Sequence, residues 1–211
     1  MKLVILGANG RTGMLVVRRA LDQGADVTAV VRSDAKRPMF QHDRLNVVIG
    51  DPCDPEFLTT VFRGQDAVIS TLGGRRPTKR ATAVYPLSAD AIVAAAQKAG
   101  LKMVVVTSSA LLFPPARPVD RILAFVARTV VQSASRMEQI LFAADLDVII
   151  ARCGFLKDAE ETEYRALKDA LPDDGSSISR SSLAHFLVDS VNGSESGHHV
   201  YGVSGPAARG A

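Results

Sequence analysis

Three glycines near the start of the chain have the spacing of a loop that binds phosphate groups. They are Gly7, Gly10 and Gly13, in the stretch GANGRTG. The loop follows an apolar run, KLVIL, and opens a stretch with helical periodicity that begins at Thr12. A strand, turn and helix in this order direct backbone N–H groups at an anion. The pattern predicts a site for a dinucleotide pyrophosphate, and the alternative is a turn with a structural role only.

The end of the second predicted strand indicates which dinucleotide this would be. The residue there meets the adenosine ribose, and an acidic side chain would accept a hydrogen bond from the 2′-hydroxyl of NAD. This sequence has Arg32 instead, followed by Lys36 and Arg37. A charge-assisted contact with a 2′-phosphate contributes about 1.5–3 kcal/mol, or roughly a 10- to 100-fold preference for NADPH over NADH. The alternative is that Arg32 is a solvated residue at a strand end.

Two further predicted strands end in residues that could line the same site. Asp51 follows the third strand and could accept a hydrogen bond from the adenine amino group. Gly73 and Gly74 follow the fourth strand and would let the loop lie against the cofactor. Ligands of doubly wound folds bind at this carboxyl edge of the sheet. Ordinary turn chemistry is the alternative for each of these residues.

The elements that would position these residues alternate along the chain, which predicts an α/β fold: a Rossmann-type, doubly wound parallel sheet with helices on both faces. Gly24 and Gly100 follow predicted helices where a left-handed C′ residue is expected. The chain is expected to form a single domain, 1–211, with residues 158–177 as a small C-terminal lid or insertion over the substrate region. The predicted strands are 3–6, 27–31, 45–49, 67–70, 103–107, 148–151 and 200–204, and the predicted helices include 12–23, 85–99, 120–143 and one opening at 179–184.

The composition excludes several classes of protein. The chain has 211 residues, of which 47% are hydrophobic and 22% charged, so neither disorder nor a fibrous repeat is indicated. The net charge of +3 does not favour nucleic-acid binding, and no apolar run is long enough for a membrane span. Cys53 and Cys153 are isolated, so no metal site is expected and both are interpreted as inert core thiols. A cytoplasmic location is expected, since the start shows no secretion signal.

Six motifs in order along the chain resemble those of the atypical short-chain dehydrogenases/reductases, in particular the NAD(P)H-binding group of flavin and biliverdin-IXβ reductases and the NmrA-like redox sensors. The motifs are GANGRTG at 7–13, VVRS at 30–33, GDPCD at 50–54, STLGGR at 70–75, VVVTSSALL at 104–112 and EQILFAADLDVIIARCG at 138–154. The resemblance implies cofactor contacts at Gly7, Asn9, Gly10, Arg11, Thr12, Gly13, Arg32, Lys36, Asp51, Pro52, Leu72, Gly73, Gly74, Arg75, Thr107, Ser109 and Cys153. The chain departs from the family at Cys153, where a proline is usual, and at Ser182, where an aspartate is usual.

The resemblance leaves catalysis open. Ordinary members of the superfamily pair a tyrosine with a lysine four residues later, and here those positions hold Val130 and Ala134. A later Tyr164 and Lys168 have the same spacing but come too late in the topology. Ser109 is the one catalytic candidate, and the alternative is a strand-end serine that satisfies the backbone. The four histidines form no catalytic constellation.

Two alternative functions are therefore expected, of which the protein would have one. The first is an NADPH-dependent reductase that passes hydride directly to a flavin, quinone, tetrapyrrole or similar conjugated acceptor, because such acceptors take a proton from solvent and need no Tyr–Lys pair. The second is a non-catalytic NADP(H)-sensing regulatory protein that acts through a protein partner. An epimerase or dehydratase of nucleotide sugars is disfavoured, since the proton-transfer pair is missing.

Overall fold

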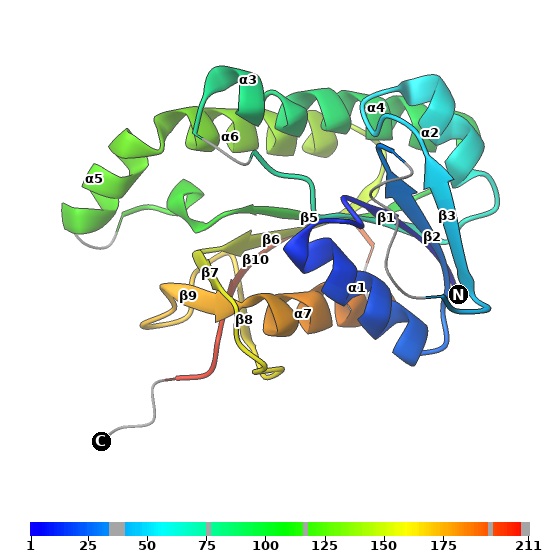
Figure 1. Cartoon of the computed structure of the whole chain (residues 1–211). Coiled ribbons are helices and arrows are strands. Elements are labelled where there is room, and N and C mark those ends of the chain that lie inside the picture. Colours follow the sequence, from blue (N-terminus) through cyan, green and yellow to red (C-terminus); the bar gives the residue numbers. More distant parts are fainter. Residues whose placement is uncertain (34–40, 75–76, 116–117, 194–195, 208–211) are drawn as a thin grey trace.

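A twisted sheet forms the centre of the molecule in the computed structural model, which describes residues 1–33, 41–74, 77–115, 118–193 and 196–207 (Figure 1). In this part of the chain eight strands pair in the order β3-β2-β1-β4-β5-β6-β10-β8. All neighbours are parallel except β10 and β8. The strands are β1 (Lys2–Leu6), β2 (Asp26–Val31), β3 (Leu45–Ile49), β4 (Ala67–Ser70), β5 (Met103–Ser109), β6 (Asp147–Cys153), β8 (Arg165–Lys168) and β10 (His198–Ser204).

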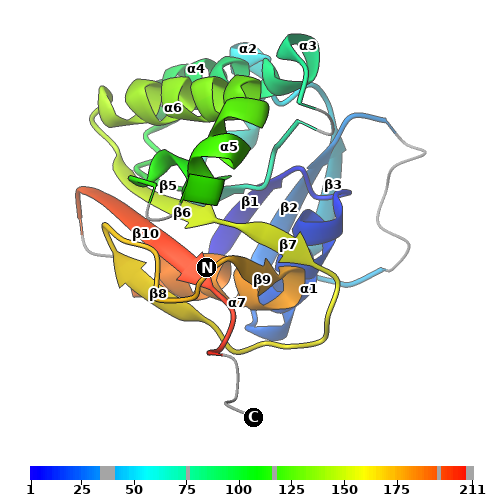
Figure 2. The same cartoon turned by 90° about the vertical axis from the view of Figure 1, so that its left-hand side faces the viewer.

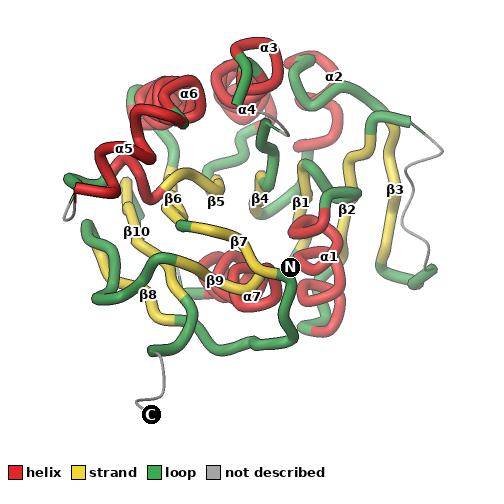
Figure 3. The backbone as a smooth tube through the Cα atoms, turned by 60° about the vertical axis from the view of Figure 1, so that its left-hand side comes forward, coloured by secondary structure: helices red, strands yellow, loops and turns green. Residues whose placement is uncertain are grey.

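Helices cover both faces of the sheet (Figure 3). The strand β1 shows why, because its side chains alternate between two buried clusters. Leu3 and Ile5 belong to the cluster under α1 (Arg11–Asp22) and α7 (Arg180–Asn192). Val4 and Leu6 belong to the cluster under α2 (Pro55–Phe62), α4 (Val84–Ala99) and α6 (Arg128–Phe142). The predicted doubly wound α/β fold is confirmed.

The seven strands predicted from the sequence are all present, each within two residues of its predicted ends. Gly24 and Gly100 have φ values of 81° and 74°, which confirms their left-handed conformation after α1 and α4. The single helix predicted over 120–143 is wrong. The structure has α5 (Pro118–Val126) and α6, separated at Ala127, whose φ of −90° and ψ of 17° lie outside the helical range. No proline or glycine marks this break in the sequence.

Several short elements were not predicted. Asp54 caps α2 by accepting from the N–H groups of Glu56 and Phe57, with Pro55 in the first helical turn. The short α3 (Lys79–Thr82) precedes α4, and η2 (Ala110–Leu112) follows β5. Within and beside the segment 158–177, β8 joins the sheet, and β7 (Phe155–Lys157) pairs with β9 (Ser177–Ser179). These strands have only three or four residues, too few for a hydrophobic period to show.

Candidate functional site

The glycine loop is a tight turn between β1 and α1. Gly7 has a φ of +80°, a conformation that residues with a side chain rarely adopt. At Gly13 a Cβ atom would lie 2.1 Å from the Gly7 carbonyl oxygen, so only glycine lets the helix approach the turn this closely. The loop is further fixed by Thr71, whose Oγ1 donates to the Leu6 carbonyl oxygen at 3.1 Å. Two of the three glycines therefore have a role within the fold.

The third glycine faces a different environment. A Cβ atom at Gly10 would meet, within 4 Å in the described structure, only the Gly7 carbonyl oxygen at 3.1 Å. Gly10 is also the N-cap of α1 and offers no side chain to the first N–H groups of the helix, and the first turn of α1 holds no acidic residue. These N–H groups have no partner within a helix. With the helix dipole they suit an anion, so the residues present fit a dinucleotide pyrophosphate.

The loop also lies where the strand order reverses. From β1 the sheet continues through β2 to β3 on one side, and through β4 to β5 and β6 on the other. Figure 2 looks onto the carboxyl ends of these strands, with β1, β2 and α1 on one side and β6 and β10 on the other. A doubly wound fold binds its ligand in the crevice at this reversal. Asn9, in the turn, and Arg11 and Thr12, in the first turn of α1, lie at this edge.

Arg32 follows β2 directly and is exposed. It lies close enough to Cys53, after β3, for its charge to lower the pKa of that thiol, although burial and Asp51 together raise the pKa to about 11. Asp51 accepts a hydrogen bond from the Cys53 backbone N–H at 2.9 Å, which is the turn chemistry that the sequence left as an alternative. Pro52 is buried in the same turn. Arg32 and Asp51 are thus brought together, whereas Lys36 and Arg75 lie outside the described residues.

The other predicted contacts lie at the ends of β4, β5 and β6. Leu72 is half-buried, and Gly74 lies against α3, since a Cβ there would be 3.0 Å from the Ala81 carbonyl oxygen. Thr107 and Ser109 are in the last three residues of β5. Ser109 Oγ accepts a hydrogen bond from the Leu111 N–H at 3.3 Å and caps η2. This is the alternative given above, a strand-end serine that satisfies the backbone. Its hydroxyl can still donate to a ligand.

Cys153 ends β6 beside Ser109, its register partner on β5. Its Sγ lies 3.5 Å from the Ser108 carbonyl oxygen, to which it donates. Burial raises the pKa of Cys153 to about 12, so the side chain is a neutral thiol at physiological pH. This agrees with the interpretation of an inert core thiol in place of the family's proline.

A buried ion pair behind this edge was not recognised as functional from the sequence. Arg152 and Glu138 contact each other twice, at 2.6 Å and 3.1 Å, and Ser108 Oγ donates to the same carboxylate at 2.6 Å. Arg152 also donates to the Leu112 carbonyl oxygen at 3.3 Å and lies over the Phe113 ring, 4.7 Å from its centroid. The network holds the segment that follows β5. The signal in the sequence was an arginine directly after the apolar run VIIA.

Arg11 connects the glycine loop to the segment 158–177. It forms an ion pair with Asp158 at 2.8 Å, and Arg180 at the start of α7 pairs with the other oxygen of Asp158 at 2.7 Å. Ser182, where the family usually has an aspartate, donates through Oγ to the Glu161 carbonyl oxygen at 2.9 Å. The start of the segment is therefore tied to the N-terminal ends of both α1 and α7.

The structure holds no Tyr–Lys pair at the usual position. Val130 and Ala134 lie on α6, and Ala134 is fully buried. Tyr164 and Lys168 do not share a helix: Tyr164 precedes β8 and donates to Asp189 on α7 at 3.1 Å, and Lys168 is the last residue of β8. Four residues of extended chain separate side chains by about 13 Å, so these two do not act as a pair.

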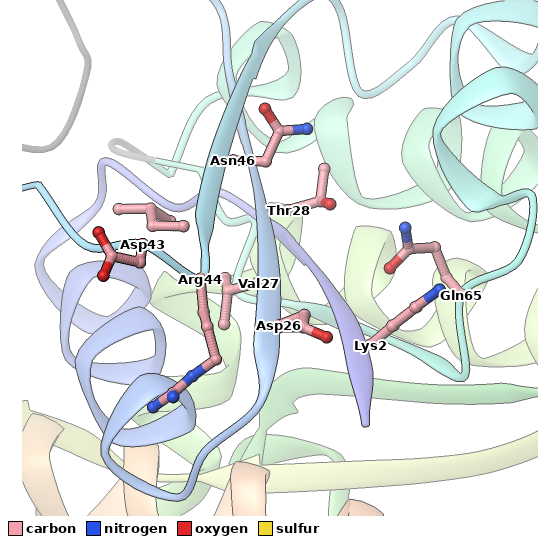
Figure 4. Close-up of a pocket in the computed structure, with 9 residues that line it drawn as sticks. Lys2, Asp26, Val27, Thr28, Asp43, Arg44, Asn46 and Gln65 are labelled. Atoms are coloured by element: carbon pink, nitrogen blue, oxygen red, sulfur yellow. The ribbon is translucent and has the colours of Figure 1, made fainter.

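A hollow of about 370 Å³ lies at the opposite edge of the sheet (Figure 4). Lys2, Asp26 and Leu45, which start β1, β2 and β3, are among the residues that line it. These residues lie at the amino ends of the strands, at the edge opposite the carboxyl ends, and none of them is a predicted site residue. In the described part of the chain, no group of three or more histidine, cysteine, aspartate or glutamate residues could hold a metal ion. None of the helices described is long and apolar enough to cross a membrane.

A family model described as NAD(P)H-binding matches residues 7–193 of this chain. The curated relative Ycf39 of Synechocystis sp., a photosystem II assembly factor, is 31% identical over 103 residues. That match covers 48% of this chain and 32% of Ycf39, so the chain matches only about a third of this relative's length. Ycf39 of Guillardia theta is 33% identical over the same number of residues, 33% of its own length.

Solved structures share the fold over almost the whole chain. ChuY of Escherichia coli O157:H7, described as an anaerobillin reductase, is 20% identical with a TM-score of 0.79, covering 100% of both chains. A short-chain dehydrogenase/reductase of Veillonella parvula in complex with NADP is 20% identical with a TM-score of 0.79, covering 98% of this chain and 95% of that one. At this identity the two structures establish the fold alone.

Proposed function

The chain belongs to the NAD(P)H-binding family, and we propose that it is an NADPH-dependent reductase that passes hydride directly to a flavin, a quinone or a tetrapyrrole. The observation that carries the proposal is the uncapped N-terminus of α1 at the point where the strand order reverses. Nothing in the first turn of α1 competes for its N–H groups, and Gly10 leaves space in front of them.

The cofactor is proposed to lie across the carboxyl ends of the strands. The N–H groups of the first turn of α1 would bind the pyrophosphate. Arg32 would bind the 2′-phosphate beside Asp51 and the turn after β3, which is the basis for preferring NADPH to NADH. Thr107, Ser109 and Cys153, at the ends of β5 and β6, would lie beside the nicotinamide. When bound, NADPH supplies the hydride, and the protein orients the acceptor and excludes water.

The acceptor is proposed to be flat and largely apolar, because aromatic and aliphatic side chains follow the strands at this end. Phe113 comes directly after η2 and is held by Arg152, and Phe155, the first residue of β7, is 64% exposed. On α5, Ile122, Phe125 and Val126 are also more than 60% exposed. Such surfaces suit the conjugated rings of the proposed acceptors. The description of ChuY as an anaerobillin reductase supports including tetrapyrroles among them.

Ser109 and the segment 158–177 are proposed to complete the site. Ser109 Oγ would donate to the acceptor or to the nicotinamide amide while it accepts from Leu111. The segment would act as a lid. Its ties to Arg11, Arg180 and Ser182 support this role, because they fix one end of the segment at the edge where the cofactor is proposed to bind.

The test is to measure NADPH oxidation with a panel of flavins, quinones and tetrapyrroles, together with the affinity for NADPH and NADH by nicotinamide fluorescence. Turnover of at least one acceptor class, with tighter binding of NADPH than of NADH, is expected. Tight binding without any turnover would overturn the reductase. Equal affinity for the two dinucleotides would overturn the assignment of Arg32.

A second function has its own support. The chain lacks the Tyr–Lys pair, and α5 presents an apolar surface to which a partner protein could bind. Ycf39, a relative that matches part of this chain, is described as an assembly factor. A non-catalytic NADP(H) sensor should bind its partner differently with NADP⁺ and with NADPH. A pull-down whose captured proteins do not depend on the redox state of the cofactor would contradict this second function.

A further inference from the structure

Tyr85 is a half-buried phenol at the carboxyl edge of the sheet. It lies in the first turn of α4, with its ring against the apolar cluster under α2, α4 and α6. Its hydroxyl reaches the loop after β4: a Cβ atom at Gly73 would lie 3.2 Å from Tyr85 Oη and 3.8 Å from Cζ. Gly73 therefore leaves room for this hydroxyl at the edge of the sheet.

The hydroxyl lies at the carboxyl edge of the sheet, beside the loop that follows β4. It adjoins Gly73 and hydrogen-bonds with the Gly74 backbone. In the sheet β4 and β5 are parallel neighbours, with Ser70 opposite Val106. Gly73 and Ser109 each follow these partners by three residues, so the hydroxyl lies at the same edge of the sheet as Ser109 at the end of β5.

The surroundings keep this phenol protonated. Burial raises the pKa of Tyr85, while hydrogen bonding with the Gly74 backbone acts in the opposite direction. Cys153 is itself a neutral thiol at physiological pH, with a pKa raised to about 12. Tyr85 thus holds a proton on Oη close to the proposed position of the nicotinamide, at a place where no Tyr–Lys pair supplies one.

We propose that Tyr85 is the proton donor to the acceptor in the reduction, an inference that rests on the proposed function. The acceptor gains hydride, with its two electrons, at one atom, and the resulting anion takes the Oη proton at another. The phenolate then recovers a proton from water. The balance is acceptor plus NADPH plus H⁺ giving reduced acceptor plus NADP⁺. Tyr85 would matter most for a quinone, whose reduced oxygen is basic, and least for a flavin, whose reduced form is stable as an anion.

The first test compares Tyr85→Phe with wild type, using Tyr201→Phe as the matched control. Tyr201 lies on β10 and packs against Phe186, with ring centroids 5.7 Å apart, in the cluster on the opposite face of the sheet. With a naphthoquinone, Tyr85→Phe is expected to lower turnover roughly 100-fold or more, the scale of general acid catalysis. The solvent deuterium isotope effect should change as well. With a flavin, and for Tyr201→Phe with either acceptor, turnover should be nearly unchanged.

The second test does not depend on turnover. In protein labelled with [13Cζ]tyrosine, the resonance that Tyr85→Phe removes should shift when NADP⁺ is added, and the resonance that Tyr201→Phe removes should not. NADPH affinity should be retained in both variants. An unmoved Tyr85 resonance at saturating NADP⁺, or equal quinone turnover in Tyr85→Phe and wild type, overturns the role of Tyr85 and leaves the reductase standing. Wild type that binds NADPH but reduces no acceptor overturns both.

Discussion

Glu138 on α6 and Arg152 on β6 form a buried ion pair with two contacts, Oε2 to Nη2 at 2.6 Å and Oε1 to Nε at 3.1 Å. The side chain of Glu138 is 5% exposed and that of Arg152 17%. Ser108 on β5 donates to the same carboxylate, and Arg152 also reaches the Leu112 carbonyl oxygen. The pair therefore joins α6, β6, β5 and the segment that continues toward Phe113. It thereby holds the segment that leads to Phe113, where the acceptor is proposed to bind.

Replacing Glu138 by alanine should destabilise the fold strongly. The substitution leaves the Arg152 charge buried without its partner and Ser108 without its acceptor. Removal of one member of a buried pair typically lowers the free energy of unfolding by about 3–5 kcal/mol. Urea denaturation of Glu138→Ala measures this change.

The matched control is Asp145→Ala, which removes the exposed partner of Lys102, an ion pair of 2.7 Å. Exposed pairs contribute little, so the unfolding midpoint of this variant should stay close to that of wild type. If Glu138→Ala were no less stable than Asp145→Ala, the buried pair would not hold this part of the fold.

Gly13→Ala should lower the stability of the protein, whereas Gly10→Ala should lower its affinity for NADPH. At Gly13 the added Cβ would lie 2.1 Å from the Gly7 carbonyl oxygen, so the helix must move, at a cost of about 1–3 kcal/mol of stability or more. At Gly10 the added Cβ meets only that oxygen at 3.1 Å, and stability should change little. NADPH affinity of Gly10→Ala should nevertheless fall about tenfold or more, equivalent to about 1.4 kcal/mol.

Thermal unfolding and nicotinamide fluorescence, measured on both variants, separate these two effects. Unchanged NADPH affinity in Gly10→Ala would mean that the pyrophosphate does not approach the backbone at this glycine.

Much of the fold could be predicted because its signals are local. The apolar, β-branched runs predicted seven strands, and Gly24 and Gly100 marked two helix ends. The break at Ala127 could not be predicted, because no proline or glycine stands there. The short strands β7, β8 and β9 depend on pairing with distant partners, which no window of sequence contains.

The places of several candidate site residues in the fold could also be predicted, whereas their roles stay predictions. The ends of the strands could be recognised in the sequence, and the carboxyl ends of parallel strands meet at one edge of a sheet. Arg32, Asp51 and Ser109 could therefore be placed at the same edge. Tyr85 could not be assigned, because it comes from the start of a helix and reaches the edge through side-chain packing. The pairing of Arg11 with Asp158 likewise joins residues that are far apart in the sequence and meet only in the fold.

Replacing Arg32 by alanine should lower NADPH affinity and leave NADH affinity unchanged. The expected loss is 10- to 100-fold, because a charge-assisted hydrogen bond contributes about 1.5–3 kcal/mol and NADH lacks the phosphate. Fluorescence titration with both dinucleotides gives the ratio directly. Arg136→Ala, at an exposed arginine on α6, serves as the control for lost charge and should leave both affinities unchanged. A parallel loss for NADPH and NADH in Arg32→Ala would place Arg32 elsewhere on the cofactor.

Both cysteines should react slowly with a disulfide reagent in the folded protein. The pKa values are raised to about 11 for Cys53 and about 12 for Cys153, mainly by burial. At pH 8 the thiolate fractions would be on the order of 10⁻³ and 10⁻⁴, and the thiolate is the reactive form. Cys53, which is partly exposed, should react before the buried Cys153. In guanidinium, which unfolds the protein, both thiols should react rapidly and together. A thiol that reacts in the folded protein as fast as in the unfolded chain would contradict their inert character.

The same shifts predict how stability depends on pH. The pKa of Cys153 in the folded protein is about 12, above the ordinary value of 9.0, so the folded state holds this proton more tightly than the unfolded state does. The resulting stabilisation is complete below pH 9 and is lost as the pH rises from about 9 toward 12, where the unfolded thiol ionises first. Urea denaturation between pH 8 and 10.5 should therefore show a falling free energy of unfolding, with a smaller slope in Cys153→Ala. Identical slopes in the variant and in wild type would show that this thiol does not contribute to the loss.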